Sequence, residues 1–209
     1  MRIALLHSIE TNPAVFDRVA ATFGPPALAL RHEIRVDLRE AMQREGGQAP
    51  RIQACLRSLA AEADAVIVTC AMLGAAVDDT AAMGVPIVRA DKSLAQAAMA
   101  QGGDVTVICA AASAVDATRR LFAAHAPAAG STVTVRHIPE IWDLYLQGDV
   151  PAALARTALA ADAAYESGAD VVAFAHPWMA DAARPAADGR RPLDSAHAAL
   201  RTALSGGGK

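Results

Sequence analysis

The chain has 209 residues, of which 54% are hydrophobic and 20% charged, and its formal net charge is −3. This length can bury a core without disulfide or metal support, and the composition excludes an intrinsically disordered chain. Only 4% of the residues are aromatic, about a quarter are alanine, and the Lys and Arg residues are scattered. Because nucleic-acid binding needs clustered basic side chains and stacking aromatics, we expect no nucleic-acid partner.

Three cysteines, Cys55, Cys70 and Cys109, lack C-x-x-C spacing. Their odd number favours reduced thiols over a disulfide framework or a zinc site. The N-terminal apolar run is too short for a signal peptide, and no run reaches the roughly 18 apolar residues of a membrane helix. We therefore expect a cytoplasmic protein without a membrane partner.

Short β-rich apolar runs alternate with longer alanine-rich segments along the whole chain. This alternation predicts an α/β fold with parallel strands, each followed by a crossover helix. The predicted strands are 2–7, 29–36, 65–70, 86–90, 105–110, 132–138 and 171–176. The predicted helices are 50–62, 73–83, 93–101, 113–125, 150–167 and 194–204, and the predicted loops are 39–50 and 185–192. Seven strands fit one large sheet or two small ones.

Two segments of the chain resemble each other. Each runs from a helix end through an acidic residue into a short strand and a turn, so that Cys70 follows Asp64, and His176 follows Asp170, by six positions. Two similar α/β halves would place these turns at matching strand ends on either side of a cleft. Chance similarity between two alanine-rich segments is the alternative.

Cys70 is the candidate catalytic thiol. It ends a predicted buried strand and precedes a predicted helix, a position where backbone N–H groups favour a thiolate. A small core residue is the alternative, but ligands of open α/β sheets bind at the carboxyl ends of strands. Cys55, inside a helix, and Cys109, inside a strand, are interpreted as packing residues.

His176 stands at the end of another predicted strand, where Pro177 fixes the following backbone and Trp178 and Met179 supply apolar walls. A histidine can transfer protons near neutral pH, so it could oppose Cys70 in acid–base chemistry. The alternative is a hydrogen-bonded structural histidine.

Polar groups near the predicted strand ends are candidates for binding a carboxylate. Ser8 and Asn12 follow the first strand, although turn formation explains such residues equally well. Ser113 could cap the helix that it begins, bind an anion, or do both. The full set of candidate substrate-binding residues is Ser8, Asn12, Ala71, Met72, Ser113 and Pro177.

The sequence has no glycine-rich nucleotide motif, no G-x-S-x-G and no H-E-x-x-H. Its other histidines are far apart and lack metal-ligand spacing. We therefore expect chemistry that uses neither a cofactor nor a metal.

With these features, the chain resembles the aspartate/glutamate/hydantoin racemase superfamily, which also contains arylmalonate decarboxylases and maleate isomerases. The segments that carry the resemblance are 3–13, 64–74, 84–88, 105–113 and 169–180. The resemblance implies two flavodoxin-like lobes with parallel sheets, related by pseudo-twofold symmetry, and an active-site cleft between them. Residues 1–92 with 190–209 would form the first lobe, including a returning C-terminal helix, and residues 93–189 the second.

In the racemases of this superfamily a cysteine from each lobe flanks the substrate α-carbon, and Cys70 matches the first of them. The second is missing, because His176 or, within alignment error, Ala175 stands at its position. Ala71 replaces a Ser or Thr that often follows the first cysteine, and residues 110–112 are alanines where the family often has Thr.

We therefore predict a cofactor-independent racemase or isomerase that transfers a proton at the carbon next to a carboxylate of an amino acid or hydantoin-like acid. Cys70 would be the thiolate base and His176 the opposing acid or base. A decarboxylase of a malonate-like acid and a non-catalytic small-acid binding protein are the alternatives.

The family resemblance also predicts a homo-oligomer, with a dimer favoured. Ile141, Trp142, Leu144 and Tyr145 could form an anchor patch for it, or they could pack within one subunit.

Overall fold

The computed structural model describes residues 1–24, 28–45, 47–74, 77, 83–126, 131–186 and 188–206. The chain divides into two compact units: Met1–Ser93 with Ala196–Lys209 form unit 1, and Leu94–Ser195 form unit 2. Within the described residues each unit has its own four-stranded sheet, and every strand pair is parallel. The predicted α/β fold class is confirmed, and the choice between one sheet and two is resolved in favour of two.

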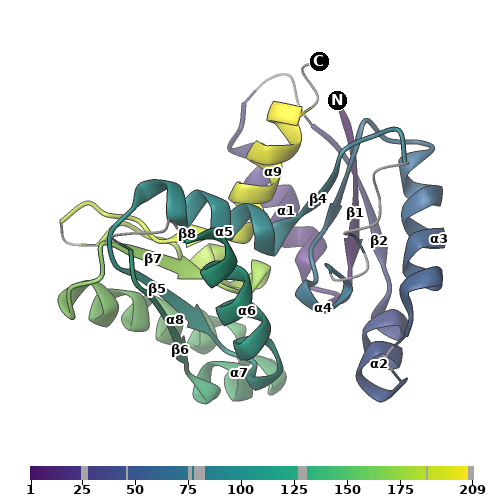
Figure 1. The fold of residues 1–209 in the computed structure, drawn as a ribbon. Coiled ribbons are helices and arrows are strands. Elements are labelled where there is room, and N and C mark those ends of the chain that lie inside the picture. Colours follow the sequence, from purple (N-terminus) through teal and green to yellow (C-terminus); the bar gives the residue numbers. More distant parts are fainter. Residues whose placement is uncertain are drawn as a thin grey trace. The chain divides into compact units, whose positions relative to one another are not determined.

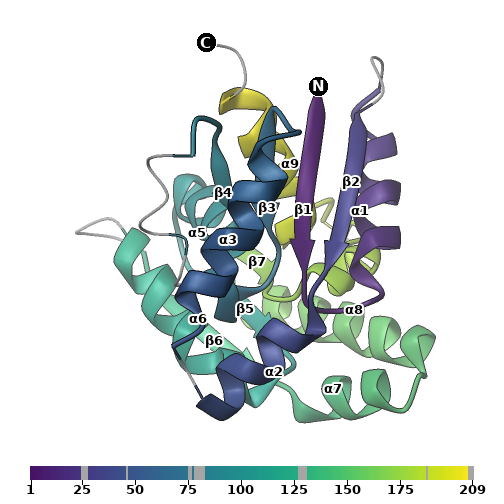
Figure 2. The ribbon, with the colours of Figure 1, turned by 90° about the vertical axis from the view of Figure 1, so that its right-hand side faces the viewer.

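Unit 1 has the strand order β2-β1-β3-β4, and α3 covers one face of the sheet while α1 and α9 lie on the other (Figures 1 and 2). Its strands are β1 (Arg2–His7), β2 (Ala29–Ile34), β3 (Ala65–Val68) and β4 (Ile87–Arg89). Its helices are α1 (Asn12–Ala21), α2 (Val36–Glu45), α3 (Ala49–Ala60), α4 (Ala71–Gly74) and, from Ala196, α9 (Ser195–Gly206).

Side-chain alternation along β1 divides the core of unit 1 between the two faces of its sheet. Ala4 and Leu6 pack in a buried cluster with Leu38 of α2 and Ile52 of α3. The intervening side chains face α1, where the His7 ring lies 5.5 Å from that of Phe16. Since both faces are covered, β3 is apolar throughout and β1 is apolar from Ile3 to Leu6.

Unit 2 repeats this layout with the order β6-β5-β7-β8, and α8 packs against α7 (Figure 1). Its strands are β5 (Val105–Cys109), β6 (Val133–His137), β7 (Val171–Phe174) and β8 (Leu193–Asp194). Its helices are α6 (Ala112–His125), α7 (Pro139–Leu146), α8 (Val150–Glu166) and the 3₁₀ helix η2 (Pro177–Ala182), and α5 (Ala90–Gln101) contains the boundary between the units.

The two similar sequence segments make the same contacts in both units. At the amino end of β3, Asp64 Oδ2 accepts the backbone N–H of Arg2 at 2.7 Å. At the amino end of β7, Asp170 Oδ2 accepts the backbone N–H of Asp104 at 2.8 Å. Each carboxylate thereby ties its own strand to the start of the central strand beside it.

The carboxyl ends of the same strands also correspond. The N–H of Thr69 donates to a β1 carbonyl and the N–H of Ala175 to a β5 carbonyl, both at 3.0 Å. Cys70 and His176 are the next residues along the chain. They therefore occupy equivalent positions in the two units, so the sequence similarity is structural and not a coincidence.

The structure differs from the sequence-based elements in several places. Residues 39–50 were expected to form a loop, but α2 continues to Glu45 because Leu38 and Ala41 give it a buried stripe. The sequence analysis also missed α1, α7 and the two-residue β8. Most of the predicted helix 73–83 lies outside the described residues. In the described part, α4 begins at Ala71 and ends at Gly74.

None of the helices in the described part of the chain combines the length and the apolar character needed to cross a lipid bilayer.

Two adjacent glycines test the Asp170 contact. Both have positive φ, +74° for Gly102 and +77° for Gly103, but a Cβ on Gly103 would lie 2.3 Å from Asp170 Oδ2, whereas a Cβ on Gly102 would meet nothing within 4 Å. We expect Gly102→Ala to cost about 1 kcal/mol through backbone strain. Gly103→Ala should cost at least about 1 kcal/mol more, because the bond from Asp170 to the β5 edge breaks.

Urea unfolding followed by tryptophan fluorescence measures the difference, because Trp142 and Trp178 both belong to unit 2. Equal losses in the two variants would show that the Asp170 contact does not stabilise unit 2.

Candidate active site

Cys70 lies between β3 and α4 and is partly buried. Its side chain packs against the buried cluster that α2 and α3 form on the sheet. Its carbonyl accepts the N–H of Gly74 at 3.0 Å, which closes the single turn of α4. Ala71 and Met72 in that turn are also partly exposed. Cys70 is therefore a partly buried residue at the carboxyl edge of the sheet.

Ser8 and Asn12 are more deeply buried than loop residues usually are, with 1% and 2% of their surfaces exposed. Asn12 is the first residue of α1, and its Oδ1 is buried without a hydrogen-bond partner among the described residues. An unsatisfied buried carbonyl costs free energy, so this oxygen is a candidate acceptor for an N–H group of a ligand.

In unit 2 the His176 ring is held by main-chain donors. Its Nε2 accepts the N–H groups of Ala110 at 3.1 Å and Ala111 at 3.2 Å, and Cys109 Sγ lies 3.7 Å away. Burial, with a smaller effect from the charge of His137, lowers the pKa of His176 to about 4. Because Nε2 acts as an acceptor, the neutral ring carries its proton on Nδ1.

This arrangement corrects the predicted helix cap. Ala111, not Ser113, precedes the first turn of α6, and no side chain caps the helix. Ser113 lies in the first turn and is exposed. His176 therefore occupies the N–H groups of Ala110 and Ala111 at this end of β5. The expectation that Ser113 could bind an anion stays a prediction.

The residues around His176 form an aromatic cluster within unit 2. Trp178 stacks on Tyr145 with ring centroids 4.3 Å apart, and its ring lies 6.1 Å from that of His176. Trp142 stacks on Tyr145 at 5.5 Å, and Ile141 is fully buried. Of the two expectations for the 141–145 segment, packing within unit 2 is the one that these contacts support.

The other two cysteines are poor candidates for a thiolate. Cys109 is fully buried, and burial raises its pKa to about 11. Cys55 packs against the same buried cluster as Cys70, and burial raises its pKa too. Both remain thiols at neutral pH.

The sequence analysis missed a group of hydrogen-bonded side chains beside Cys70. Thr69, His7, His32 and Asp17 are linked in that order by three contacts of 3.0, 2.9 and 3.1 Å. The sequence signal for this group was that His7 and His32 fall in neighbouring strands. Whether their side chains meet depends on the register of β1 and β2, which the sequence does not give. Among the described residues no group of three or more His, Cys, Asp or Glu side chains could hold a metal ion.

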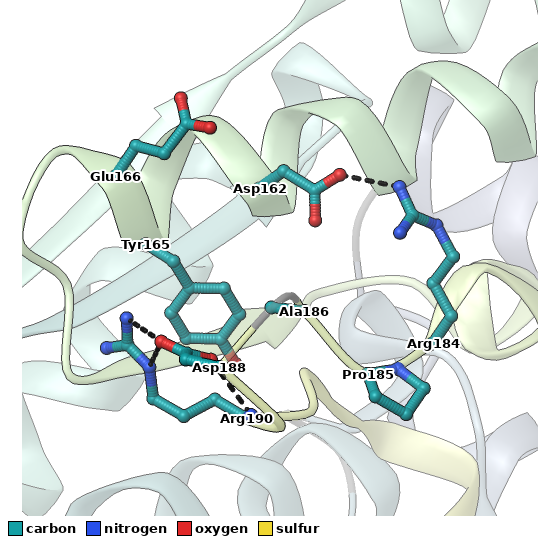
Figure 3. A pocket seen from close by; sticks show the side chains of 8 residues that line it. All are labelled: Asp162, Tyr165, Glu166, Arg184, Pro185, Ala186, Asp188 and Arg190. Carbon is teal, nitrogen blue, oxygen red and sulfur yellow. Dashed lines mark hydrogen bonds and ion pairs between the residues drawn. The ribbon is translucent and has the colours of Figure 1, made fainter.

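A separate hollow of about 550 Å³ lies on the surface of unit 2 and contains none of the predicted site residues. Figure 3 shows that Asp162 faces Arg184 and Asp188 faces Arg190, whereas the Glu166 carboxylate points away from both pairs. The Arg190 guanidinium also lies over the Tyr165 ring, 4.4 Å from its centroid. Because these four charges already pair with one another, the hollow gives no reason to assign it a particular ligand.

Solved structures of racemases share this fold. An aspartate racemase homologue from Pyrococcus horikoshii aligns over 100% of this chain and 99% of its own, with a TM-score of 0.70 and 14% identity. The Picrophilus torridus aspartate racemase aligns over 100% and 94%, with a TM-score of 0.73 and 10% identity. The allantoin racemase of Pseudomonas fluorescens aligns over 98% and 90%, with a TM-score of 0.63 and 18% identity.

No protein-family model matches the sequence, and no curated protein matches it. The resemblance to the racemase superfamily is thus confirmed in the fold, over essentially the whole length of the chain.

The low pKa of His176 predicts a loss of stability in acid. In the unfolded chain the ring takes up a proton near pH 6.5, whereas in the folded chain it does so near pH 4. The unfolded state therefore binds more protons between these values, and the free energy of unfolding falls by up to about 1.4 kcal/mol per pH unit as the pH decreases.

His176→Gln keeps an acceptor for the two N–H groups but does not titrate, so its unfolding free energy should fall less steeply from pH 6.5 to 4.5. Urea unfolding followed by tryptophan fluorescence measures both slopes. Identical slopes would contradict a neutral His176 in the folded chain.

Proposed function

We propose that the chain is a cofactor-independent racemase or isomerase that transfers a proton at the carbon next to a carboxylate. The observation that carries this proposal is the place of Cys70, a partly buried cysteine at the carboxyl end of β3 in a racemase-like fold. Carboxyl ends of strands are where open α/β sheets bind ligands and place reactive groups. The substrate class is an amino acid or a hydantoin-like small acid.

Cys70 is the base in this proposal. Its thiolate removes the α-hydrogen, so that the C–H bond breaks, an S–H bond forms, and negative charge develops on the carbon and its carboxylate. An α-hydrogen beside a carboxylate is very weakly acidic, so hydrogen-bond donors must stabilise this charge in the transition state. The N–H groups of Ala71 and Met72, with Ser8, are the candidate donors in unit 1.

His176 is the proposed donor of the returning proton, through Nδ1–H. Two features support this role: its Nε2 is occupied by two main-chain N–H groups, and its low pKa disfavours the imidazolium form. Those N–H groups also stabilise the ring once the Nδ1 proton has left. Donation of this proton leaves an imidazolate, which takes a proton from water before the next turnover, while the Cys70 thiol gives up the proton that it gained.

Asn12 is the proposed contact for the nitrogen of the substrate. Its unpartnered Oδ1 requires an N–H donor, and both amino acids and hydantoin-like ureido compounds carry one. This oxygen gives no support to a direct contact with a carboxylate, because both groups are acceptors.

The thiol is tested by isotope exchange. In D₂O, wild-type protein should exchange the α-hydrogen of a substrate and interconvert its enantiomers, followed by proton NMR and polarimetry. The compounds to screen are aspartate, glutamate and allantoin. Cys70→Ala should reduce both rates by at least about 10³-fold, because no other thiolate replaces the base.

Cys55→Ala is the matched control, since it removes a partly buried thiol from the same packing cluster. It should retain wild-type exchange. Exchange of the α-hydrogen at the wild-type rate in Cys70→Ala would remove Cys70 from the mechanism. If the wild-type protein instead releases CO₂ from malonates and exchanges no α-hydrogen, the chain is a decarboxylase.

The proposal requires that Cys70 and His176 act on one substrate. His176→Gln should slow inversion more than it slows exchange, because Cys70 can still remove and return a proton on its own face. In the Cys70→Ala background, His176→Gln should add little further loss.

Asn12→Leu separates stability from binding. Removing a side chain whose Oδ1 is buried without a partner should leave the free energy of unfolding unchanged or raise it by about 1 kcal/mol. The same change should raise KM at least about tenfold, because the substrate N–H loses its acceptor. A destabilised variant with unchanged KM would show that the amide is structural.

A further inference from the structure

A chain of hydrogen bonds in unit 1 runs from the end of β3 to the protein surface. Thr69 Oγ1 lies 3.0 Å from His7 Nδ1, His7 Nε2 lies 2.9 Å from His32 Nδ1, and His32 Nε2 lies 3.1 Å from Asp17 Oδ1. Thr69 and His7 are 5% and 0% exposed, whereas the His32 and Asp17 side chains are 17% and 61% exposed. The two inner residues are thus buried, and exposure increases from His7 to the Asp17 carboxylate.

When His32 is neutral, every donor in this chain points towards the surface. His32 must donate from Nε2 to the Asp17 carboxylate, so its Nδ1 accepts. His7 then donates from Nε2 and accepts at Nδ1, and the only donor available there is the Thr69 hydroxyl. One proton on each ring satisfies all three bonds.

When His32 is protonated, the inner bonds reverse. Its Nδ1 becomes a donor, so His7 accepts at Nε2 and carries its own proton on Nδ1. The Thr69 hydroxyl then accepts from His7 and turns its hydrogen to the Leu6 carbonyl, which lies 3.1 Å away. The two arrangements differ by one added proton, and His7 changes tautomer without becoming charged.

The charge in the second arrangement resides on His32. Burial, and then the charge of His32, lowers the pKa of His7 to about 3, so His7 stays neutral. His32 is beside the Asp17 carboxylate of α1, its neighbours Arg31 and Glu33 point to the other face of the sheet, and Arg31 pairs with Glu62.

On the face of the sheet that His32 shares with α1 and α9, the other histidine is His197 of α9. Its Nε2 lies 3.5 Å from the Thr22 hydroxyl, just past the end of α1. It contacts Thr22 and the Phe23 ring, not the chain that ends at Asp17.

The last bond of the chain acts on the main chain that carries Cys70. The Leu6 carbonyl already accepts the N–H of Thr69 at 3.0 Å. In the protonated arrangement it accepts the Thr69 hydroxyl as well, so two bonds hold the end of β3 to β1 immediately before Cys70. In the neutral arrangement the hydroxyl is turned to His7 and one bond remains.

We propose that His7, His32 and Asp17 are positioning residues that transmit protonation of His32 to the Thr69 hydroxyl, and so change how firmly the residue before Cys70 is held. None of them touches the substrate in this proposal. The coupling is a property of unit 1 and goes beyond the proposed reaction, so it can be tested whether or not the chain turns over a substrate.

The first test is nitrogen-15 NMR of the imidazole rings from pH 9 to 5, the range in which histidines change charge. His32→Gln identifies the His32 signals. As pH falls through the His32 transition, the proton of His7 should move from Nε2 to Nδ1, and His7 should stay neutral. An unchanged His7 tautomer, or an imidazolium signal from His7, would overturn the proposal.

A charge-neutral variant tests the outer end of the chain. Asp17→Asn keeps an acceptor for His32 but removes its negative charge, so the shared midpoint of the His32 and His7 changes should move down by about 0.5 pH unit or more. Glu40→Gln is the control, because Glu40 is an exposed helix carboxylate of unit 1 that pairs with Arg44. It should leave the midpoint unchanged, and a shift equal to that of Asp17→Asn would contradict a specific chain.

The second test measures the effect on Cys70 through its rate of alkylation, quantified by peptide mass spectrometry. Thr69→Val removes the hydroxyl. The alkylation rate of Cys70 depends on its thiolate fraction in both proteins, so dividing the variant rate by the wild-type rate at each pH removes this shared dependence. This ratio should change about threefold across the His32 midpoint, the effect of one hydrogen bond. Thr69→Ser keeps a hydroxyl, so its ratio should stay constant; a constant ratio for Thr69→Val would overturn the coupling.

Discussion

The carboxyl ends of the central strands carry polar groups that must find partners inside an interior made largely of alanine and aliphatic residues. Unsatisfied, each such group would cost about 1–3 kcal/mol. Histidine meets this need in both units: His7 bridges Thr69 and His32 in unit 1, and His176 accepts two main-chain N–H groups in unit 2. Neutral imidazole suits the task because it offers one donor and one acceptor on a mostly apolar ring.

This constraint explains why the two units, with the same strand order and the same acid-to-backbone contacts, have diverged at their reactive edge. In unit 1 the histidine is on β1, which leaves the position after β3 to a small, partly exposed thiol. In unit 2 the histidine itself takes the corresponding position after β7 and covers the donors at the end of β5. Because a cysteine occupies this position in unit 1 and a histidine occupies it in unit 2, the two units are chemically asymmetric although their folds are similar.

Local sequence was sufficient to predict the parallel α/β fold, because apolar runs such as 65–68 and 105–109 are buried on both faces and cannot be mistaken for half-exposed strands. It failed for α2, whose polar composition hides a narrow buried stripe, and for β8, whose two residues carry no periodicity. Cys70 and His176 could be placed just after β3 and β7 because strand ends can be located in a sequence. The links of His7 to His32, and of His176 to Ala110, depend on strand register and side-chain direction, which no local pattern contains.

The order of the segments along the chain has a consequence for synthesis. Unit 2 is one continuous stretch, so a ribosome delivers all of it before the final helix emerges. Unit 1 is interrupted, and the face of its sheet that holds His7 receives α9 only when residues beyond 195 have been made. The unit that carries Cys70 is therefore the one whose sheet is covered last during synthesis, because its final helix is separated from the rest of it by the whole of unit 2.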